Sequence, residues 1–204
     1  QSIRSAIRDP EELCRRLRLP QWYQRGAKQA AQLFEVFVPE PYLGRIQPGN
    51  PDDPLLRQVL PLSEEAEAGK DFSFDPVGDA AALKAPGLLQ KYGSRVLLVA
   101  TGACAVHCRY CFRRHFPYDQ MPHGMDDWQP AIQQIQEDAT LEEVILSGGD
   151  PLMLTDERLA ELVRSIESIE HVKRLRIHTR LPIMIPSRVN DSLLAWLTKI
   201  RLTP

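Results

Sequence analysis

One stretch of the sequence runs from a hydrophobic segment directly into a cluster of cysteines: Ser94-Arg-Val-Leu-Leu-Val-Ala-Thr-Gly-Ala-Cys-Ala-Val-His-Cys-Arg-Tyr-Cys111. Its first eight residues are rich in leucine and β-branched residues, which is typical of a buried parallel strand. The cysteines would then leave the carboxyl end of that strand, where α/β folds place their chemistry. This order predicts a functional loop.

The three cysteines of this loop, Cys104, Cys108 and Cys111, have a CxxxCxxC spacing. Soft thiolate ligands select zinc, copper(I) or iron–sulfur clusters. A structural zinc ion takes four ligands, and an electron-carrying [4Fe-4S] cluster normally takes four cysteines. Three cysteines leave one metal position open, and an open position is where a substrate can bind.

The composition is that of an ordinary globular protein: 204 residues, 43% hydrophobic and 25% charged, with a formal net charge of -2. The near-neutral charge gives no reason to expect a nucleic acid partner. We expect no membrane association, because no apolar run approaches the ~18 residues of a span and no signal peptide opens the chain. Clustered cysteines fit metal ligation in a reducing compartment better than a disulfide framework, so we expect a cytoplasmic protein.

The pattern along the chain divides near residue 92. Residues 1–92 predict helices that begin after Asp9 and near residue 24, followed by an exposed acidic loop over residues 63–83. Residues 93–204 predict three strand–helix units. The expected strands cover residues 95–100, 143–147 and 174–179, and the expected helices cover residues 128–137, 155–169 and 190–200. The fold class is therefore α/β with an N-terminal helical region.

A glycine-rich motif, Ser147-Gly148-Gly149-Asp150-Pro151-Leu152, follows the second predicted strand. Two glycines let the backbone come close to a ligand, and exposed backbone groups can pair with an amino acid moiety. The same residues are also typical of an ordinary turn after a strand. Their position, one strand–helix unit after the cysteines, favours a binding site.

Basic residues follow both motifs. The guanidinium of Arg113 suits bidentate capture of a carboxylate. Arg114 and His115 fit a solvated basic loop equally well. Arg180 and His178 follow the third predicted strand. At that position Arg180 could pair with Asp150 or contact a ligand, and the sequence favours neither.

The cysteine motif, with the aromatic Tyr110 before the last cysteine, resembles the signature of the radical S-adenosylmethionine (SAM) enzymes. Further segments resemble the lysine 2,3-aminomutase family over nearly the whole chain: Pro51–Gln58, Pro86–Tyr92, Cys108–Tyr118, Ser147–Leu152 and Lys173–Pro182. Phe112 and the His-Phe-Pro-Tyr118 segment are most similar to the bacterial branch that makes (R)-β-lysine for the modification of elongation factor P.

This resemblance implies a radical SAM enzyme, an isomerase, with three cofactors: a [4Fe-4S] cluster, SAM and pyridoxal 5′-phosphate (PLP). The amino group of L-α-lysine would move from C2 to C3, with an external electron donor reducing the cluster. The implied fold is a partial (βα)6 barrel, of which the chain would contain the first three units. A homo-oligomer is left open.

The resemblance also assigns residues. Cys104, Cys108 and Cys111 would hold the cluster, and Arg113 the substrate carboxylate. The residues implied to bind SAM are Tyr110, Ser147, Gly148, Gly149 and Asp150, and those implied to reach the PLP phosphate are Arg95 and Lys91. Lys91 stands where the family has an arginine, so the charge is kept without the bidentate geometry.

The lysine that would hold PLP, and the acidic residues for the substrate ε-amino group, belong to a C-terminal part of the family that the 204 residues lack. We therefore expect an incomplete enzyme that does not turn over alone. Two alternatives stay open at this stage: another radical SAM reaction on the same scaffold, or a non-catalytic metal module. In the second case an iron–sulfur cluster, or a zinc ion completed by His107, His115 or His123, would be bound.

Overall fold

The computed structural model describes residues 3–67, 73–122 and 124–202. The chain forms two compact units. Unit 1 comprises Gln1–Pro76, Ala105–His115 and Ile183–Ile185, and unit 2 comprises Val77–Cys104, Phe116–Pro182 and Pro186–Pro204. This division differs from the boundary expected near residue 92, because most of the cysteine loop lies in the unit formed mainly by the N-terminal segment.

Unit 1 is built from short helices, as predicted. Asp9 begins the first helix by accepting a hydrogen bond from the Glu11 backbone N–H at 3.0 Å, and Pro10 occupies the first helical position, where no N–H is needed. The helices of this unit are α1 (Pro10–Arg16), α2 (Gln21–Ala31) and α3 (Glu40–Leu43), with 3-10 turns η1 (Leu56–Gln58) and η2 (Ser63–Ala66). Their apolar faces meet at a core that includes the fully buried Leu13, Tyr42 and Leu56.

Unit 2 contains a five-stranded sheet in the order β1-β2-β3-β4-β5 within the described residues. The strands are β1 (Leu83–Ala85), β2 (Leu88–Tyr92), β3 (Arg95–Thr101), β4 (Glu143–Gly148) and β5 (Arg174–Ile177). β1, β2 and β3 pair antiparallel, whereas β3, β4 and β5 pair parallel. The three strands expected from the sequence are thus confirmed, and the carboxyl ends of β3 and β4 meet at one edge.

The β1–β2 hairpin was not expected, because residues 1–92 showed no strand signal. Pro86 and Gly87 form the two-residue connection, and Gly87 has a φ of 74°, a conformation that glycine adopts at little cost. They turn the chain back so that β2 can extend the sheet beside β3.

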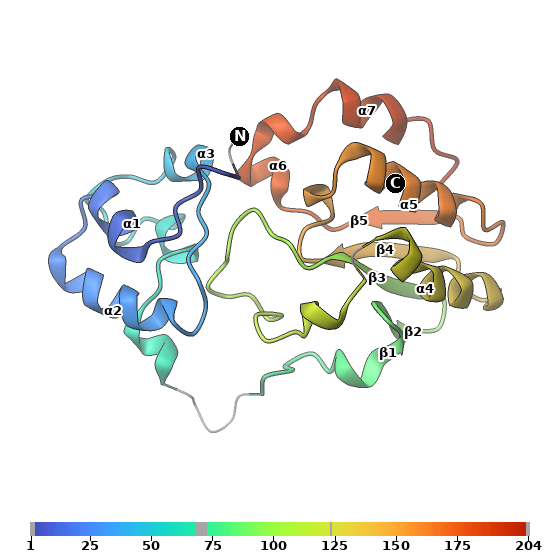
Figure 1. Ribbon diagram of the computed structural model, residues 1–204, viewed down its shortest axis with the longest axis horizontal. Coiled ribbons are helices and arrows are strands. Elements are labelled where there is room, and N and C mark those ends of the chain that lie inside the picture. The colour runs from blue at the N-terminus through green and yellow to red at the C-terminus, as the bar shows by residue number, and fades with distance from the viewer. Residues whose placement is uncertain (1–2, 68–72, 123, 203–204) are drawn as a thin grey trace. The chain divides into compact units, whose positions relative to one another are not determined.

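Helices lie against the parallel part of the sheet (Figure 1). The remaining elements of the chain are α4 (Met125–Glu137), α5 (Asp156–Glu167), α6 (Leu181–Met184) and α7 (Asp191–Leu197), with 3-10 turns η3 (Ala80–Ala82), η4 (Tyr118–Gln120), η5 (Pro151–Met153) and η6 (Pro186–Arg188). α4 and α5 bury Trp128 and Leu162, while Val96, Val144 and Leu175 are the buried, register-matched residues of three adjacent strands. The result is a mixed α/β unit.

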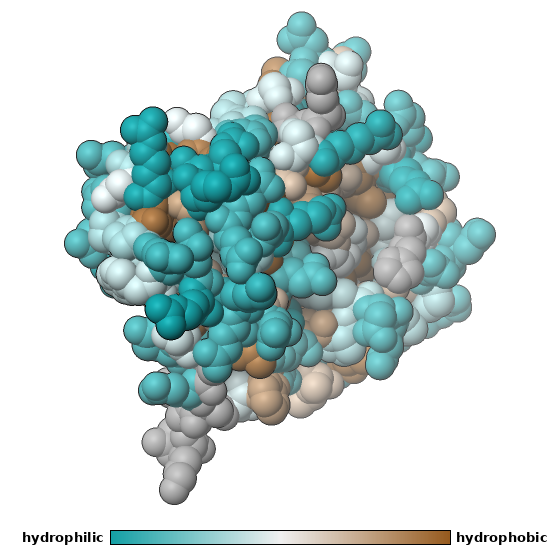
Figure 2. Space-filling model, turned by 60° about the vertical axis from the view of Figure 1, so that its left-hand side comes forward, coloured by the Kyte–Doolittle hydropathy of each residue, from teal (hydrophilic) through white to brown (hydrophobic). Residues whose placement is uncertain are grey.

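The face of the molecule drawn in Figure 2 is mostly hydrophilic, with its hydrophobic residues in separate small patches. This agrees with the mean hydropathy of -0.30. In the ranges that the structure describes, no helix combines the length and the apolar character needed to cross a bilayer.

Candidate functional site

The cysteine loop begins at the carboxyl end of β3, in a closely packed turn of unit 2. The Thr101 hydroxyl accepts a hydrogen bond from the Ala103 backbone N–H at 3.1 Å. A Cβ added to Gly102 would lie 2.7 Å from the Cβ of Tyr118, so only glycine fits there without a shift. Because of this packing, the direction in which the chain enters Cys104 is fixed.

The glycine-rich motif lies directly against this turn. Gly149 donates its backbone N–H to the Thr101 carbonyl at 2.7 Å, and Asp150 donates its own to the Ala103 carbonyl at 2.8 Å. A Cβ on Gly149 would come within 2.3 Å of the Ala103 carbonyl oxygen. Gly148 has a φ of 109°, and a Cβ there would meet the Thr101 carbonyl oxygen at 2.7 Å. The structure therefore brings the two motifs together, and the glycines permit that approach.

The carboxylate of Asp150 is occupied by the protein itself. One oxygen accepts from the Leu152 N–H at 3.0 Å and the Thr179 hydroxyl at 2.6 Å, and the other from the N–H groups of Arg180 at 2.8 Å and Leu181 at 3.0 Å. Asp150 thereby joins the carboxyl ends of β4 and β5. The predicted relation between Arg180 and Asp150 exists, but through the Arg180 backbone.

The four cysteines are present as thiols in two different environments. Cys14 is fully buried, and burial, followed by the charges of Asp9 and Glu11, raises the pKa of its thiol to about 11. Such a thiol is inert. Cys104, Cys108 and Cys111 are partly exposed instead, as ligands that must accept a metal have to be.

Cys108 and Cys111 belong to one turn of unit 1, because the Cys111 N–H donates to the Cys108 carbonyl at 3.0 Å. Burial raises the pKa of the Cys111 thiol, outweighing the opposite effects of Arg113 and Arg114. Cys104 is the last residue of its segment in unit 2. In the described part of the chain, no three His, Cys, Asp or Glu side chains are gathered closely enough to hold a metal ion. As a donor set, three partly exposed thiols within eight residues do fit an iron–sulfur cluster.

His107 is held by the N-terminal segment of unit 1. Its backbone N–H donates to the Phe37 carbonyl at 3.0 Å, and its Nδ1 contacts the Glu35 carbonyl at 3.0 Å. A carbonyl only accepts, so Nδ1 carries the proton in this contact. The ring also stacks on Phe34, with centroids 5.0 Å apart. These contacts hold His107 in the framework of unit 1; His123 lies outside the described residues.

Arg109 and Tyr110 are tied to the same unit. The Arg109 N–H donates to the Gln58 carbonyl at 2.8 Å, and the Tyr110 hydroxyl donates to the Gln58 side-chain oxygen at 3.1 Å. The Tyr110 residue nevertheless stays 58% exposed.

Glu65 is a site residue that the sequence reasoning missed. Its carboxylate accepts two hydrogen bonds from the Arg109 guanidinium, at 2.8 and 2.7 Å, and one from Arg114 at 3.1 Å. Burial would raise the pKa of Glu65, but the hydrogen bond and charge of Arg109, followed by Arg114, lower it overall. Residues 63–83 were expected to be an exposed loop. The only signal in the sequence was two arginines beside the cysteines that required a counter-charge.

Arg113 is buried, with 9% of its surface exposed, and its guanidinium lies 4.8 Å above the Phe112 ring. The solvated basic loop considered for this region therefore does not describe Arg113. The neighbouring His115 meets the exposed Phe74 edge to face, with ring centroids 4.7 Å apart.

Arg95 and Lys91 lie at the opposite end of the sheet from Thr101, where β3 ends and the chain leads to Cys104. Arg95 begins β3, so it is separated from Thr101 by a strand of about 20 Å. Its Nε is buried, without a hydrogen-bond partner among the described residues. Lys91 instead donates to the buried Asp79 carboxylate and to the Val77 carbonyl, both at 2.6 Å. The sequence thus did not foresee that Lys91 is used in an internal ion pair.

Other charged side chains lie near Arg95, on the neighbouring strands at the same end of the sheet. Its register partner on β4 is Glu143, which is buried and forms ion pairs with Arg174 at 3.7 Å and Arg176 at 3.1 Å. Arg95, Glu143 and Arg174 are aligned across three neighbouring strands. Arg174 and Arg176 thus both pair with Glu143 at the amino end of the parallel strands.

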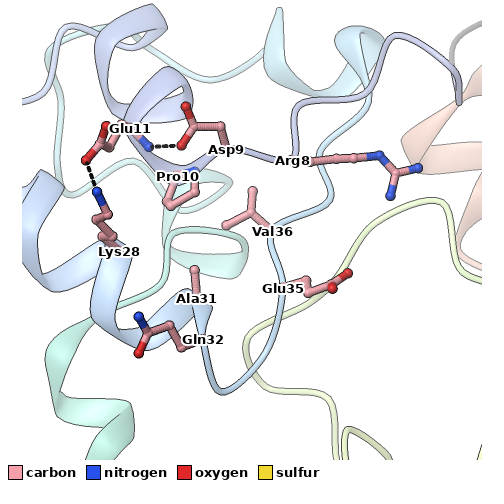
Figure 3. A pocket seen from close by; sticks show the side chains of 9 residues that line it. All are labelled: Arg8, Asp9, Pro10, Glu11, Lys28, Ala31, Gln32, Glu35 and Val36. Atoms are coloured by element: carbon pink, nitrogen blue, oxygen red, sulfur yellow. Dashed lines mark hydrogen bonds and ion pairs between the residues drawn. The ribbon is translucent and has the colours of Figure 1, made fainter.

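A separate pocket of about 470 Å³ lies in unit 1 (Figure 3). Its charged residues serve the protein: Lys28 pairs with Glu11 at 3.0 Å, Asp9 caps α1, and the Arg8 guanidinium lies 4.5 Å from the centre of the Phe37 ring. We do not regard this pocket as the candidate site.

Comparison with known proteins finds one family model and several relatives that match the candidate site. Residues 89–180 match the family model "4Fe-4S single cluster domain". L-lysine 2,3-aminomutase of Haemophilus influenzae is 46% identical over 200 residues, which are 98% of this chain and 59% of that protein. The Escherichia coli protein of the same name is 45% identical over 94% of this chain and 56% of its own length, and that of Clostridium subterminale is 32% identical over 97% and 48%.

The chain thus spans less than two thirds of the length of these relatives, and the similarity covers nearly all of the chain itself. The matched cluster domain contains Cys104, Cys108 and Cys111 as well as the glycine-rich motif. Over the length that it spans, the sequence is similar to proteins named L-lysine 2,3-aminomutase, at 44–46% identity for three of them.

Proposed function

We propose that the chain carries the cluster-binding and SAM-binding residues of a radical SAM, PLP-dependent isomerase that converts L-α-lysine to (R)-β-lysine. The name of the relatives, L-lysine 2,3-aminomutase, and the match to a 4Fe-4S domain support this reaction. The three parallel strands with intervening helices are compatible with the first units of a partial (βα)6 barrel.

The observation that carries the proposal is the contact between the two motifs. Backbone N–H groups of Gly149 and Asp150 bind the carbonyls of Thr101 and Ala103, immediately before Cys104. A ligand that chelates an open iron beside Cys104 would therefore also reach the backbone of the glycine-rich loop. An amino acid moiety with adjacent amino and carboxylate groups suits both partners.

When bound, the cluster, SAM and PLP supply the radical and the electron-accepting ring for moving an amino group. The residues of this chain bind and orient. Cys104, Cys108 and Cys111 provide the thiolates, and the backbone of Gly148 and Gly149 provides polar groups for the SAM amino acid moiety. Asp150 shapes that loop from within, since its oxygens are occupied by protein donors.

For the remaining ligands we propose one residue each. Arg113, buried beside the cysteine turn, holds the substrate α-carboxylate by its guanidinium fork. Arg95 holds the PLP phosphate, because its buried Nε fits an anionic acceptor. Lys91 contributes less to that phosphate, since Asp79 already neutralises its ammonium group.

The setting follows from the same chemistry. The four cysteines are thiols, which favours a reducing compartment such as the cytoplasm. An external protein or small reductant supplies the electron for the cluster. We further propose that the product serves the modification of elongation factor P, on the basis of the Phe112 and His-Phe-Pro-Tyr118 resemblance.

Anaerobic reconstitution tests the proposal. The chain is loaded with iron and sulfide and reduced, and its EPR spectrum is recorded with and without SAM. We expect a [4Fe-4S] signal that changes when SAM is added. Cys14→Ser should keep this behaviour, because Cys14 is buried in α1, whereas Cys108→Ser should lose the cluster.

Two results would count against it. A signal that ignores SAM, or a zinc content near one per chain in place of iron, would mean a metal module without SAM chemistry. L-lysine and PLP are then added to the SAM-bound sample. A further spectral change supports lysine as the substrate.

A further inference from the structure

The turn between Cys108 and Cys111 carries an arginine that points away from solvent. Arg109 has 6% of its side chain exposed, and its guanidinium donates to the Phe34 carbonyl at 2.7 Å as well as to Glu65. Planar bidentate pairs of this kind fix geometry as well as contributing energy. Arg109 is the immediate neighbour of Cys108 in the chain, so fixing its side chain constrains the turn.

The same carboxylate also binds a residue on the far side of Cys111. Arg114 reaches Glu65 at 3.1 Å, and its N–H donates to the Cys111 carbonyl at 3.2 Å. Both guanidiniums lie over the Phe34 ring, with distances to its centroid of 5.1 Å for Arg109 and 4.9 Å for Arg114. Glu65 thus bridges the two sides of the turn that bears Cys111.

Charge explains why this position needs a carboxylate. Two guanidiniums with 6% and 17% of their side chains exposed meet one carboxylate with 16% exposed. Without Glu65 the two cations would face each other in a poorly solvated place, where like charges repel more strongly than in water. A neutral glutamine would leave this repulsion in place and would lose one acceptor oxygen.

We infer that Glu65 is a positioning residue: by bridging Arg109 and Arg114 it holds the Cys108–Cys111 turn in the form that ligates the cluster, and it offsets their positive charge beside the metal. The inference rests on the proposed cluster site. The protein surroundings of a cluster set how its ligands are oriented and how easily it is reduced. Glu65 supplies both effects from a segment 43 residues before Cys108.

The test compares Glu65→Gln with a matched control, Glu40→Gln. Glu40 also forms a bidentate pair with an arginine of unit 1, Arg16, at 3.1 and 2.8 Å, but that pair is exposed and does not involve the cysteine turn. Glu65→Asp keeps the charge with a shorter reach. In the metal-free protein, the rate at which iodoacetamide alkylates each cysteine is followed by peptide mass spectrometry.

We expect Cys108 and Cys111 to react severalfold faster in Glu65→Gln than in the wild type, with Glu40→Gln unchanged. In the reconstituted protein, Glu65→Gln should hold less iron and its cluster should have a more positive midpoint potential, because a nearby negative charge is gone. Glu65→Asp should return the potential toward that of the wild type. General destabilisation alone would not produce this charge-dependent return.

The inference is overturned if Glu65→Gln matches Glu40→Gln in both alkylation rates and potential. If Glu65→Gln does not fold, Arg114→Gln, which removes one side of the bridge, decides: rates at Cys108 and Cys111 equal to the wild type overturn the inference, and raised rates support it. A wild-type chain that takes up no cluster would defeat the proposed function instead. The alkylation rates, which need no metal, would still decide the role of Glu65.

Discussion

Asp150 has four hydrogen-bond donors around one buried carboxylate, three of them backbone N–H groups. Sequence resemblance assigned this residue to SAM binding. In the structure, the Asp150 carboxylate instead holds the loops after β4 and β5 together. Asp150 can therefore support the proposed SAM site indirectly, by fixing the backbone of the loop that contains it.

We predict that Asp150→Asn lowers the free energy of unfolding by roughly 1–3 kcal/mol. Either orientation of the amide directs an NH₂ group at donors, whether Leu152 or the pair Arg180 and Leu181. Urea titration followed by circular dichroism measures the loss. Asp126→Asn, on the exposed first turn of α4, is the control and should change little; equal effects would refute the role of Asp150.

Gly149→Ala should also destabilise the protein, by roughly 1–3 kcal/mol. The added Cβ would lie 2.3 Å from the Ala103 carbonyl oxygen, and a backbone atom cannot turn aside as a side chain would. Gly93→Ala is the matched control, because nothing lies within 4 Å of its Cβ position. Thermal unfolding of both variants checks the expectation, and a Gly149→Ala protein as stable as Gly93→Ala would contradict it.

The sequence singles out these residues, and Cys104, Cys108 and Cys111, as site candidates because their chemistry is visible in local motifs. It did not anticipate Glu65. The Glu65–Arg109 contact joins positions 44 residues apart, and no local periodicity marks such a pair. The engagement of Lys91 with Asp79 was missed for the same reason, since a lysine looks alike whether it meets a ligand or a carboxylate of its own chain.

Among the elements, those with strong local signals were predicted correctly. Thr155 and Asn190 cap α5 and α7 through their side chains, and both helices begin within one residue of the expected start. The strand predicted over residues 174–179 was two residues too long, because β5 ends at Ile177. The β1–β2 hairpin was missed, since its strands are short and pair mainly with each other and β3.

The loop before η1 depends on one buried aspartate. Asp53 accepts backbone hydrogen bonds from Gln47 at 3.0 Å, Leu55 at 2.8 Å and Leu56 at 3.0 Å. Burial would raise the pKa of Asp53, but these three donors outweigh it and lower the pKa overall. The folded protein thus binds this proton less readily than the unfolded chain does.

It follows that Asp53 stabilises the fold above the unfolded pKa of about 3.9, and that this contribution disappears as the pH falls through the lower folded value. We predict that Asp53→Asn costs on the order of 1 kcal/mol at pH 7 and less at pH 3. Urea midpoints at the two pH values measure this. The exposed neighbour Asp52 provides the control, because the loss of unfolding free energy in Asp52→Asn should not depend on pH in this way. A loss for Asp53→Asn that is the same at pH 7 and pH 3 would disprove the linkage.

On the scale of the molecule, metal loading should raise thermal stability. A group that binds only the folded chain stabilises it by mass action, and each 1 kcal/mol raises the melting temperature by about 2–4 °C in a chain of this size. Calorimetry should therefore show a higher melting temperature for the reconstituted protein than for the metal-free one. Replacing Cys104, Cys108 and Cys111 together by serine should abolish the difference, and Cys14→Ser should keep it.

The mixed α/β class was predictable because three strand–helix units follow one another with clear patterns. The division into units was not, because unit 1 takes residues 105–115 from the middle of the chain. Hydrophobic periodicity describes an element and its own neighbours. Hydrophobic periodicity carries no information about which distant segment will contact the side chains of His107 and Arg109.

That interleaving has a consequence for synthesis on the ribosome. When residue 76 has been made, Phe34 and Glu65 of unit 1 still lack their partners His107, Arg109 and Arg114, which appear only as the nascent chain reaches residue 115. At ~5–20 residues per second, the intervening roughly 40 residues take about 2–8 s. During that interval Phe34 lacks the His107 ring that stacks on it in the folded chain.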